Sequence, residues 1–153
     1  MRYLPKQLSK KDRQKQSKML RFSRKAYKKG QYFTRKKLSS FHSSKSPHII
    51  KAQKMYGLEK IAPTQELARK TKCSVRALAK IVNKGAGAYF SSGSRPNQTA
   101  QSWGIARLAS SVTGGKAAAV DYNILKEGCA VGSKALRLAS HVKHPRKTRR
   151  VTL

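Results

Sequence analysis

The side chains of this sequence that could do chemistry are mainly cationic. Lysine and arginine number 36 against five aspartates and glutamates, which gives a formal net charge of +31. A chain with this charge repels itself and favours a polyanionic partner, such as nucleic-acid phosphates or an acidic protein surface. The residues that we expect to contact a polyanion or another partner are Arg21, Arg24, Lys25, Arg35, Lys36, Lys37, Arg76, Lys80, Lys84, Arg95, Arg146, Lys147, Arg149 and Arg150.

The residue pattern does not favour an enzyme. Five carboxylates spread over 153 residues offer no close pair for general acid and base catalysis. The Thr113–Lys116 stretch has the lysine of a phosphate-binding loop, but Ser110 and Ala117 stand where that pattern needs glycine and a hydroxyl residue. His141 and His144 have no cysteine or acid nearby to complete a metal set. We therefore predict no catalytic residue, no metal site and no cofactor.

Residues 64–85 carry a recognisable DNA-binding pattern, because they resemble a helix-turn-helix. The small side chain of Ala68 would let the two helices cross closely, and the expected small core between them is Leu67, Cys73, Leu78 and Ile81. Ser74 can cap the second helix, while Lys72 occupies the turn position that usually holds glycine and must adopt a left-handed backbone at a cost of roughly 1 kcal/mol. Arg76 and Lys80 would contact phosphates rather than bases. The same packing also occurs in small helical domains that never bind DNA.

The Gly/Ser-rich stretch 85–98 is expected to be a loop, and two interpretations of it stay open. Its serine hydroxyls and backbone amides could hold a phosphate near a helix that starts at about Thr99. Alternatively, its polar groups only satisfy the protein backbone. Trp103 is expected to belong to the folded core together with the helix that follows the loop.

The elements that must position these residues are helices. Apolar residues recur at helical spacing after residue 46, which predicts an all-α fold: a small multi-helix domain over 46–142 with extended basic arms at 1–45 and 143–153. In the first arm, Ser9 and Gly30 could bound a helix whose narrow apolar stripe is Met19, Phe22 and Ala26. Like charges along this helix oppose it in water, so we expect it to form on a partner.

Cysteine usage and hydropathy limit the class of protein further. Cys73 and Cys129 are too few for a disulfide framework and too far apart in sequence for paired metal ligands, which predicts free thiols in a reducing compartment. The longest apolar run is far shorter than the roughly 20 residues that cross a bilayer. We therefore predict no membrane span.

Several blocks of the chain form a recognisable pattern. Residues 87–110 read Gly-Ala-Tyr-Phe-Ser-Ser-Gly-Ser-Arg-Pro-Asn-Gln-Thr-Ala-Gln-Ser-Trp-Gly-Ile-Ala-Arg-Leu-Ala-Ser, and Thr-Gly-Gly-Lys-Ala follows from residue 113. Upstream stand Ala-Tyr-Lys-Lys-Gly-Gln-Tyr-Phe-Thr-Arg-Lys-Lys-Leu from residue 26 and Ser-Pro-His-Ile-Ile-Lys-Ala-Gln-Lys-Met-Tyr from residue 46. Together these blocks, from about Ala26 to Ala139, resemble an uncharacterised family of small basic proteins from giant, nucleocytoplasmic large DNA viruses, particularly algal ones.

The resemblance implies a virus with a large DNA genome and an icosahedral capsid, in which small basic proteins serve as capsid cement or genome binders. We therefore expect a virion structural protein, a minor capsid or cement protein whose helical core and basic arms bind larger capsid proteins. The alternative is a DNA-binding protein without sequence preference that is associated with the packaged viral genome. Both expectations place the protein in the virion, and in the host cytoplasm or nucleus during assembly.

Overall fold

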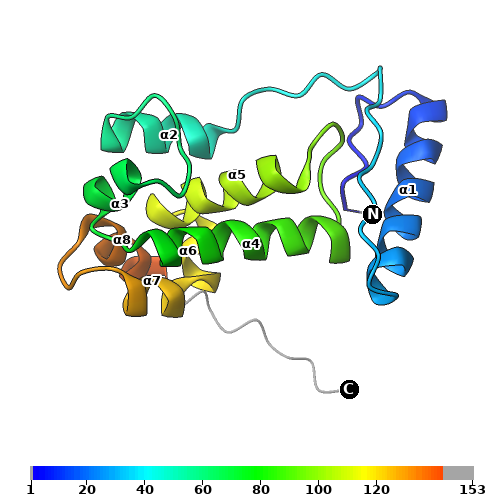
Figure 1. The fold of residues 1–153 in the computed structure, drawn as a ribbon. Coiled ribbons are helices and arrows are strands. Elements are labelled where there is room, and N and C mark those ends of the chain that lie inside the picture. The colour runs from blue at the N-terminus through cyan, green and yellow to red at the C-terminus, as the bar shows by residue number, and fades with distance from the viewer. Residues whose placement is uncertain (1, 143–153) are drawn as a thin grey trace. The chain divides into compact units, whose positions relative to one another are not determined.

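The computed structural model describes residues 2–142, which fold into helices joined by short connections, except for a longer non-helical segment over residues 29–46. The helices are α1 (Lys10–Lys28), α2 (Pro47–Tyr56), α3 (Gln65–Thr71), α4 (Val75–Ser91), α5 (Ala100–Val112), α6 (Lys116–Val120), α7 (Tyr122–Gly128) and α8 (Lys134–Val142) (Figure 1). No β-strand occurs within the described range, where Cys73 and Cys129 form an isolated antiparallel bridge. The prediction of an all-α fold is therefore confirmed.

The described residues divide into two compact units. The first contains residues 2–45 and 83–104, and the second contains residues 46–82 and 105–142. The division after Val82 falls within α4, and the division after Gly104 falls within α5. Helices α4 and α5 therefore each contribute to both units. The N-terminal 45 residues are thus not a separate extended arm, because they pack with residues 83–104 into one unit. The basic C-terminal tail, with Arg146, Lys147, Arg149 and Arg150, lies outside the described residues.

The core of the second unit is built from the apolar stripes of its helices. Its fully buried side chains include Leu67, Leu78, Ile81, Leu108, Val112 and Leu125. Helices α6, α7 and α8 pack on one another, and α2 packs against α3. Tyr56 is buried in this core, where its hydroxyl donates a hydrogen bond to the carbonyl oxygen of Val112 at 2.5 Å and burial raises its pKa to about 12. The buried phenol therefore has a hydrogen-bond partner, as buried polar groups require.

Local capping residues set several of the helix ends, including the predicted caps Ser9 and Ser74. Ser9, Thr64 and Ser74 accept hydrogen bonds from the N–H groups of Asp12, Leu67 and Ala77 at 3.1, 3.3 and 3.1 Å. Thr99 and Ser102 cap each other's backbone reciprocally at the start of α5. Gly57 ends α2 with φ of +64°, and the N–H of Leu58 donates to the carbonyl oxygen of Gln53, as in a glycine C-cap.

Two expected boundaries are wrong. Helix α4 does not stop at Gly85 but continues to Ser91, because the fully buried Tyr89 holds its last turns in place and outweighs the roughly 1 kcal/mol cost of a glycine in a helix. The apolar spacing of Val120, Ile124 and Leu125 predicts one helix over residues 116–127, but the chain leaves helical geometry at Asp121, between α6 and α7. Asp121 is fully buried at that point and its carboxylate is bound by side chains of α5.

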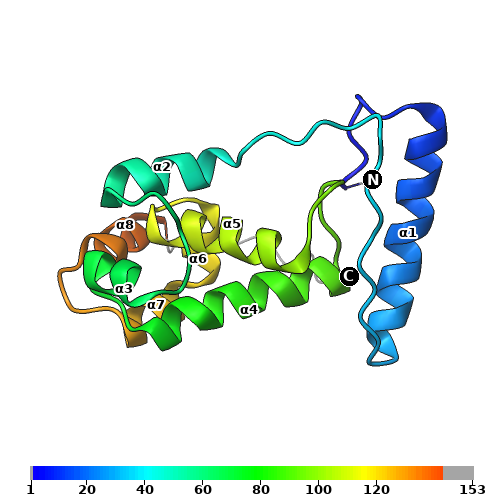
Figure 2. The ribbon, with the colours of Figure 1, turned by 45° about the horizontal axis from the view of Figure 1, so that its top comes forward.

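In the first unit, residues 30–40 turn back along α1. Gly30 reverses the chain with φ of +75°, and the segment after it runs beside α1 in both views (Figures 1 and 2). The ring of Phe33 lies edge-on to Phe22 at 4.8 Å between centroids, and Ser40 bonds to Asp12 near the start of the helix. The returning segment therefore runs antiparallel to α1 and packs along it.

Trp103 does not belong to the buried core, which corrects the expectation from sequence. Its side chain is half-buried, and its ring contacts Tyr3 edge-on at 5.7 Å between centroids. The core of the second unit instead contains the residues that follow at helical spacing in α5, including Leu108 and Ala109. Trp103 anchors the N-terminal residues of the first unit.

Candidate nucleic-acid interface

Helix α1 has a polar buried face and a strongly basic exposed face. The buried positions are Asp12, Gln16, Leu20, Ser23 and Ala26. Along one exposed side of the helix, Lys11, Lys15, Lys18, Phe22, Lys25 and Lys29 recur at spacings of four and three residues. This spacing places them in one row along a helix, about 27 Å long at 1.5 Å per residue. We name this row the α1 stripe.

The buried face of α1 is fixed by hydrogen bonds rather than by apolar packing alone. Three side chains donate to backbone carbonyl oxygens: Gln16 Nε2 to Ser94 at 3.3 Å, Ser23 Oγ to Phe90 at 3.3 Å and Arg24 Nε to Ser92 at 2.9 Å. Gly93 lies so close to α1 that a Cβ atom there would be 2.8 Å from Leu20 Cδ2. The end of α4 and the turn after it therefore hold α1 in a fixed rotation, with the stripe facing outward.

The apolar stripe of Met19, Phe22 and Ala26 that the sequence predicts is not the buried face of α1. Phe22 is 56% exposed and Met19 is half-buried, whereas Leu20 is fully buried. The spacing of apolar residues does not reveal the buried face, because that face carries the polar residues Asp12, Gln16 and Ser23. Their polar atoms form hydrogen bonds with other groups of the protein. Lys11, Lys15, Lys18 and Lys29 were therefore missed as candidate contacts. A count of lysines at heptad spacing over residues 11–29 would have found them.

Asp12 ties the start of α1 to the returning segment. Its Oδ2 accepts hydrogen bonds from the hydroxyl of Ser40 at 2.6 Å and from the N–H of Ser40 at 3.0 Å. These bonds, the hydroxyl first, hold the pKa of Asp12 below its usual value, and the charges of Lys15 and Lys11 lower it further. Ser40 Oγ also accepts a bond from the N–H of Ser9, which is the cap of α1.

The depressed pKa of Asp12 predicts an acid dependence of stability. Because the folded-state pKa is lower than the unfolded-state value, the stabilisation is present above about pH 4 and is lost as pH falls through the folded-state pKa. Asp12→Asn should therefore flatten the fall of Tm between about pH 5 and pH 2. Glu127→Gln, which removes an exposed carboxylate, is the control. Parallel Tm curves for Asp12→Asn and the unmodified protein would contradict the linkage.

Arg35 is not available to an external polyanion, contrary to the sequence-based expectation. It is only 6% exposed, and its Nη1 and Nη2 donate to the hydroxyls of Ser23 and Ser94 at 2.7 and 2.9 Å. Its guanidinium lies 3.8 Å from the centroid of the Tyr89 ring, and the Tyr89 hydroxyl accepts the Arg35 N–H. Burial lowers the pKa of Arg35 below its usual value. Arg35 is a structural cation that joins three segments of the first unit.

The other expected contacts in the first unit are on its surface. Arg21, Lys25, Lys36, Lys37, Lys84 and Arg95 are exposed, and Arg24 is half-buried with its Nε bound to Ser92. Residues 1–45 and 83–104 contain 18 lysines and arginines and a single acidic side chain, Asp12. No side-chain carboxylate in residues 2–142 forms an ion pair with a lysine of the α1 stripe. The charge of this row is therefore open to an external anion.

The contacts of the Gly/Ser-rich stretch favour the interpretation that its polar groups satisfy the protein itself over the interpretation that they hold a phosphate. Ser94 Oγ donates to the carbonyl oxygen of Arg95 and accepts from Arg35, so its hydroxyl is already bonded within the protein. Asn97 bonds to the backbone of Leu38 through both its amide oxygen and its amide nitrogen, at 2.7 and 3.2 Å. The polar groups of this stretch thus bind other segments of the first unit.

The helix-turn-helix-like segment has the local geometry expected from sequence. Lys72 ends α3 in the left-handed region with φ of +57°, and Ser74 caps α4. The four expected core residues, Leu67, Cys73, Leu78 and Ile81, are all buried, and so is Ala68 at the expected crossing. Arg76 and Lys80 are exposed on α4, one turn apart. That residues 64–85 bind DNA stays a prediction.

The prediction of free thiols is wrong, because Cys73 and Cys129 form a disulfide. Two backbone hydrogen bonds flank it: Ser74 N–H to the carbonyl oxygen of Gly128 at 2.7 Å, and Ala130 N–H to that of Lys72 at 2.8 Å. Gly128 fits against α4 because it lacks a side chain, since a Cβ atom there would lie 2.3 Å from Ala77 Cβ. The turn between α3 and α4 is thus fastened to the end of α7.

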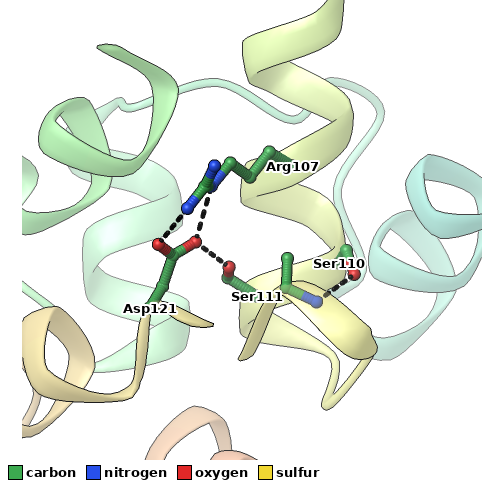
Figure 3. A network of polar contacts seen from close by, with 5 residues as sticks. Arg107, Ser110, Ser111 and Asp121 are labelled. Atoms are coloured by element: carbon green, nitrogen blue, oxygen red, sulfur yellow. Dashed lines mark hydrogen bonds and ion pairs between the residues drawn. The ribbon is translucent and has the colours of Figure 1, made fainter. Parts of the chain in front are cut away.

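A buried polar network in the second unit is structural. The Asp121 carboxylate accepts two bonds from the Arg107 guanidinium, at 2.7 and 3.0 Å, and one from the Ser111 hydroxyl at 2.6 Å (Figure 3). Ser110 Oγ accepts the N–H of Ala117 at 3.3 Å, which fastens the first turn of α6 to α5. The network thereby fixes the chain at the α6–α7 break.

Within residues 2–142, no group of three or more histidine, cysteine or acidic side chains is arranged to hold a metal ion. None of the helices in that range is long and apolar enough to cross a membrane. Comparison with curated proteins and with solved structures finds no match. A family model does match residues 1–127, which include α1 and the whole helix-turn-helix-like segment. The chain therefore belongs to a family of unknown function, DUF5824.

Proposed function

We propose that this protein binds nucleic acid through its phosphates, without reading base sequence, and that the α1 stripe is the main contact surface. The observation that carries the proposal is a fixed row of five exposed lysines, none of which forms an ion pair with a side-chain carboxylate in the described chain. Lysine presents a point charge, which suits contacts with phosphates, and base readout relies more on side chains that form paired hydrogen bonds with base edges. Arg76 and Lys80 of α4 are further cations that we assign to phosphate contacts.

The rigidity of α1 supports this proposal. A free basic tail would lose conformational entropy when it binds. Here the helix is capped by Ser9 and fastened by Gln16, Ser23 and Arg24 before any partner arrives. Lysines three and four residues apart have Cβ atoms about 5–6 Å apart on such a helix. They therefore present a continuous strip of positive potential to a phosphate backbone.

The salt dependence of binding tests the proposal. If the five stripe lysines each neutralise one phosphate, the plot of log K against log salt for duplex DNA should have a slope of about −4.5, and affinity should fall several hundred-fold between about 50 and 200 mM salt. Fluorescence anisotropy with two labelled 30-base-pair duplexes of unrelated sequence measures this slope. Equal slopes and affinities for the two sequences are expected. A flat salt response, or a strong preference for one sequence, would contradict the proposal.

A second candidate is a virion structural protein, a minor capsid or cement component. It is favoured by the resemblance described above and by the same strip of unpaired lysines, which complements an acidic face of a larger capsid protein. This candidate keeps the virion as the expected location. Polyglutamate in the anisotropy assay separates the candidates. Displacement of the duplex at equal charge concentration favours a general acidic partner, and retention of the duplex favours nucleic acid.

A further inference from the structure

Three exposed aromatic side chains, Phe22, Tyr27 and Tyr32, accompany the cations of the first unit, and two of them are more than half exposed. Phe22 is 56% exposed and lies in the middle of the α1 stripe, and Tyr32 is 71% exposed in the segment that returns along α1. We infer that the preferred ligand is single-stranded nucleic acid, whose bases stack on Phe22 and Tyr32 while the stripe lysines hold its phosphates. This inference rests on the proposed function and names its substrate class.

Both of the more exposed rings are held in place by a second ring behind them. Phe22 contacts Phe33 at 4.8 Å between centroids, with an angle of 79° between the ring planes. Tyr32 contacts Phe90 at 5.1 Å, with an angle of 55°. Because Tyr32 and Phe33 are neighbours in sequence, the two ring pairs are coupled through one peptide bond. Rings that are fixed in advance lose less conformational entropy when a base stacks on them.

Lysines on both sides of Phe22 can bind the phosphates of a single strand whose base stacks on the ring. Lys18 precedes Phe22 by four residues and Lys25 follows it by three, so both ammonium groups start from the same helix face as the ring. Proteins that bind single strands combine such a basic track with aromatic rings, and each base that stacks on a ring contributes about 1–3 kcal/mol. In a duplex the bases stack on one another and are not available to these rings. The combination therefore favours unpaired strands over duplex.

The test compares single-stranded and duplex 30-mers in the anisotropy assay, with the full-length protein and three variants. Phe22→Ala/Tyr32→Ala removes both stacking surfaces and should weaken single-strand binding about 30-fold, with the duplex affinity unchanged within about twofold. Phe22→Trp/Tyr32→Trp retains the rings and should restore single-strand affinity. Val120→Ala/Val131→Ala removes exposed apolar side chains of the second unit, 67% and 99% exposed, and should change neither affinity. Circular dichroism of each variant checks that the helices are retained.

The outcomes separate this inference from the function on which it rests. If the unmodified protein binds both ligands with a steep salt dependence but the alanine variant loses neither, stacking is excluded and phosphate binding stands. An equal loss for single strand and duplex also excludes selective stacking. If the unmodified protein binds neither ligand, the proposed function itself fails. An RNA 30-mer should bind as the single-stranded DNA does, because neither contact uses the 2′-hydroxyl, and exclusive binding of RNA would overturn the stacking account.

Discussion

Reduction of the Cys73–Cys129 disulfide is expected to lower the free energy of unfolding by about 4 kcal/mol. The bond closes a loop across a sequence separation of 56 residues, and loop-closure entropy in the unfolded chain gives a value of about this size. The loop contains α4, α5, α6 and α7 and most of the second unit's buried core. Reduction therefore raises the conformational entropy of the unfolded chain, which shifts the equilibrium toward the unfolded state.

Urea unfolding of the oxidised protein, the reduced protein and the Cys73→Ser/Cys129→Ser variant measures this effect. The reduced protein and the variant should share a lower midpoint than the oxidised protein, and reductant should not change the midpoint of the variant. The hydrogen bonds from Ser74 and Ala130 remain in all three proteins, so the fold should survive at low urea. Titration of two free thiols in the denatured protein, without reductant, would contradict the pairing.

Neutralising three lysines of the α1 stripe should weaken nucleic-acid binding about 100-fold at about 100 mM salt. The variant is Lys15→Gln/Lys18→Gln/Lys25→Gln, which leaves Phe22 and the whole buried face of α1 unchanged. Each lysine that no longer neutralises a phosphate releases one counterion fewer on binding. The effect should be similar for DNA sequences of different composition, because phosphates carry no sequence information.

The same variant should not lose stability, which distinguishes a binding defect from unfolding. Like charges three and four residues apart destabilise a helix by a few tenths of a kcal/mol per pair, so their removal should leave Tm unchanged or slightly raised. The matched control is Lys60→Gln/Lys116→Gln/Lys126→Gln, which removes three exposed lysines of the second unit. A control variant that binds as weakly as the α1 variant would show that net charge alone, and not the stripe, sets the affinity.

Sequence patterns predicted the elements whose boundaries depend on local chemistry. Ser74 and Thr99 are capping residues because their hydroxyls can reach a backbone N–H three residues later, which is a local property. Lys72 was predicted to be left-handed from its turn position alone, and it has φ of +57°. The buried positions of α3 and α4 followed from helical spacing. The all-α class could therefore be predicted without tertiary information.

The features that were missed depend on contacts between distant segments. The rotation of α1 is set by carbonyl oxygens of residues 90–94, and the disulfide joins cysteines 56 positions apart. Arg35 is buried because Ser23, Tyr89 and Ser94 converge on it from three segments. Neither composition nor periodicity carries information on such pairings. A basic residue is normally expected on the surface, and only the fold reveals that this one is internal.

The most direct test of the central claim is the difference in salt slope between the unmodified protein and the α1 variant on the same duplex. The slope counts the phosphates that the protein neutralises, so it reports on contacts rather than on affinity alone. If the three lysines contact phosphates, the slope should become shallower by about 2.7, whereas the second-unit control should keep the original slope. Equal slopes for the unmodified protein and the α1 variant would show that the α1 stripe does not contact the nucleic acid.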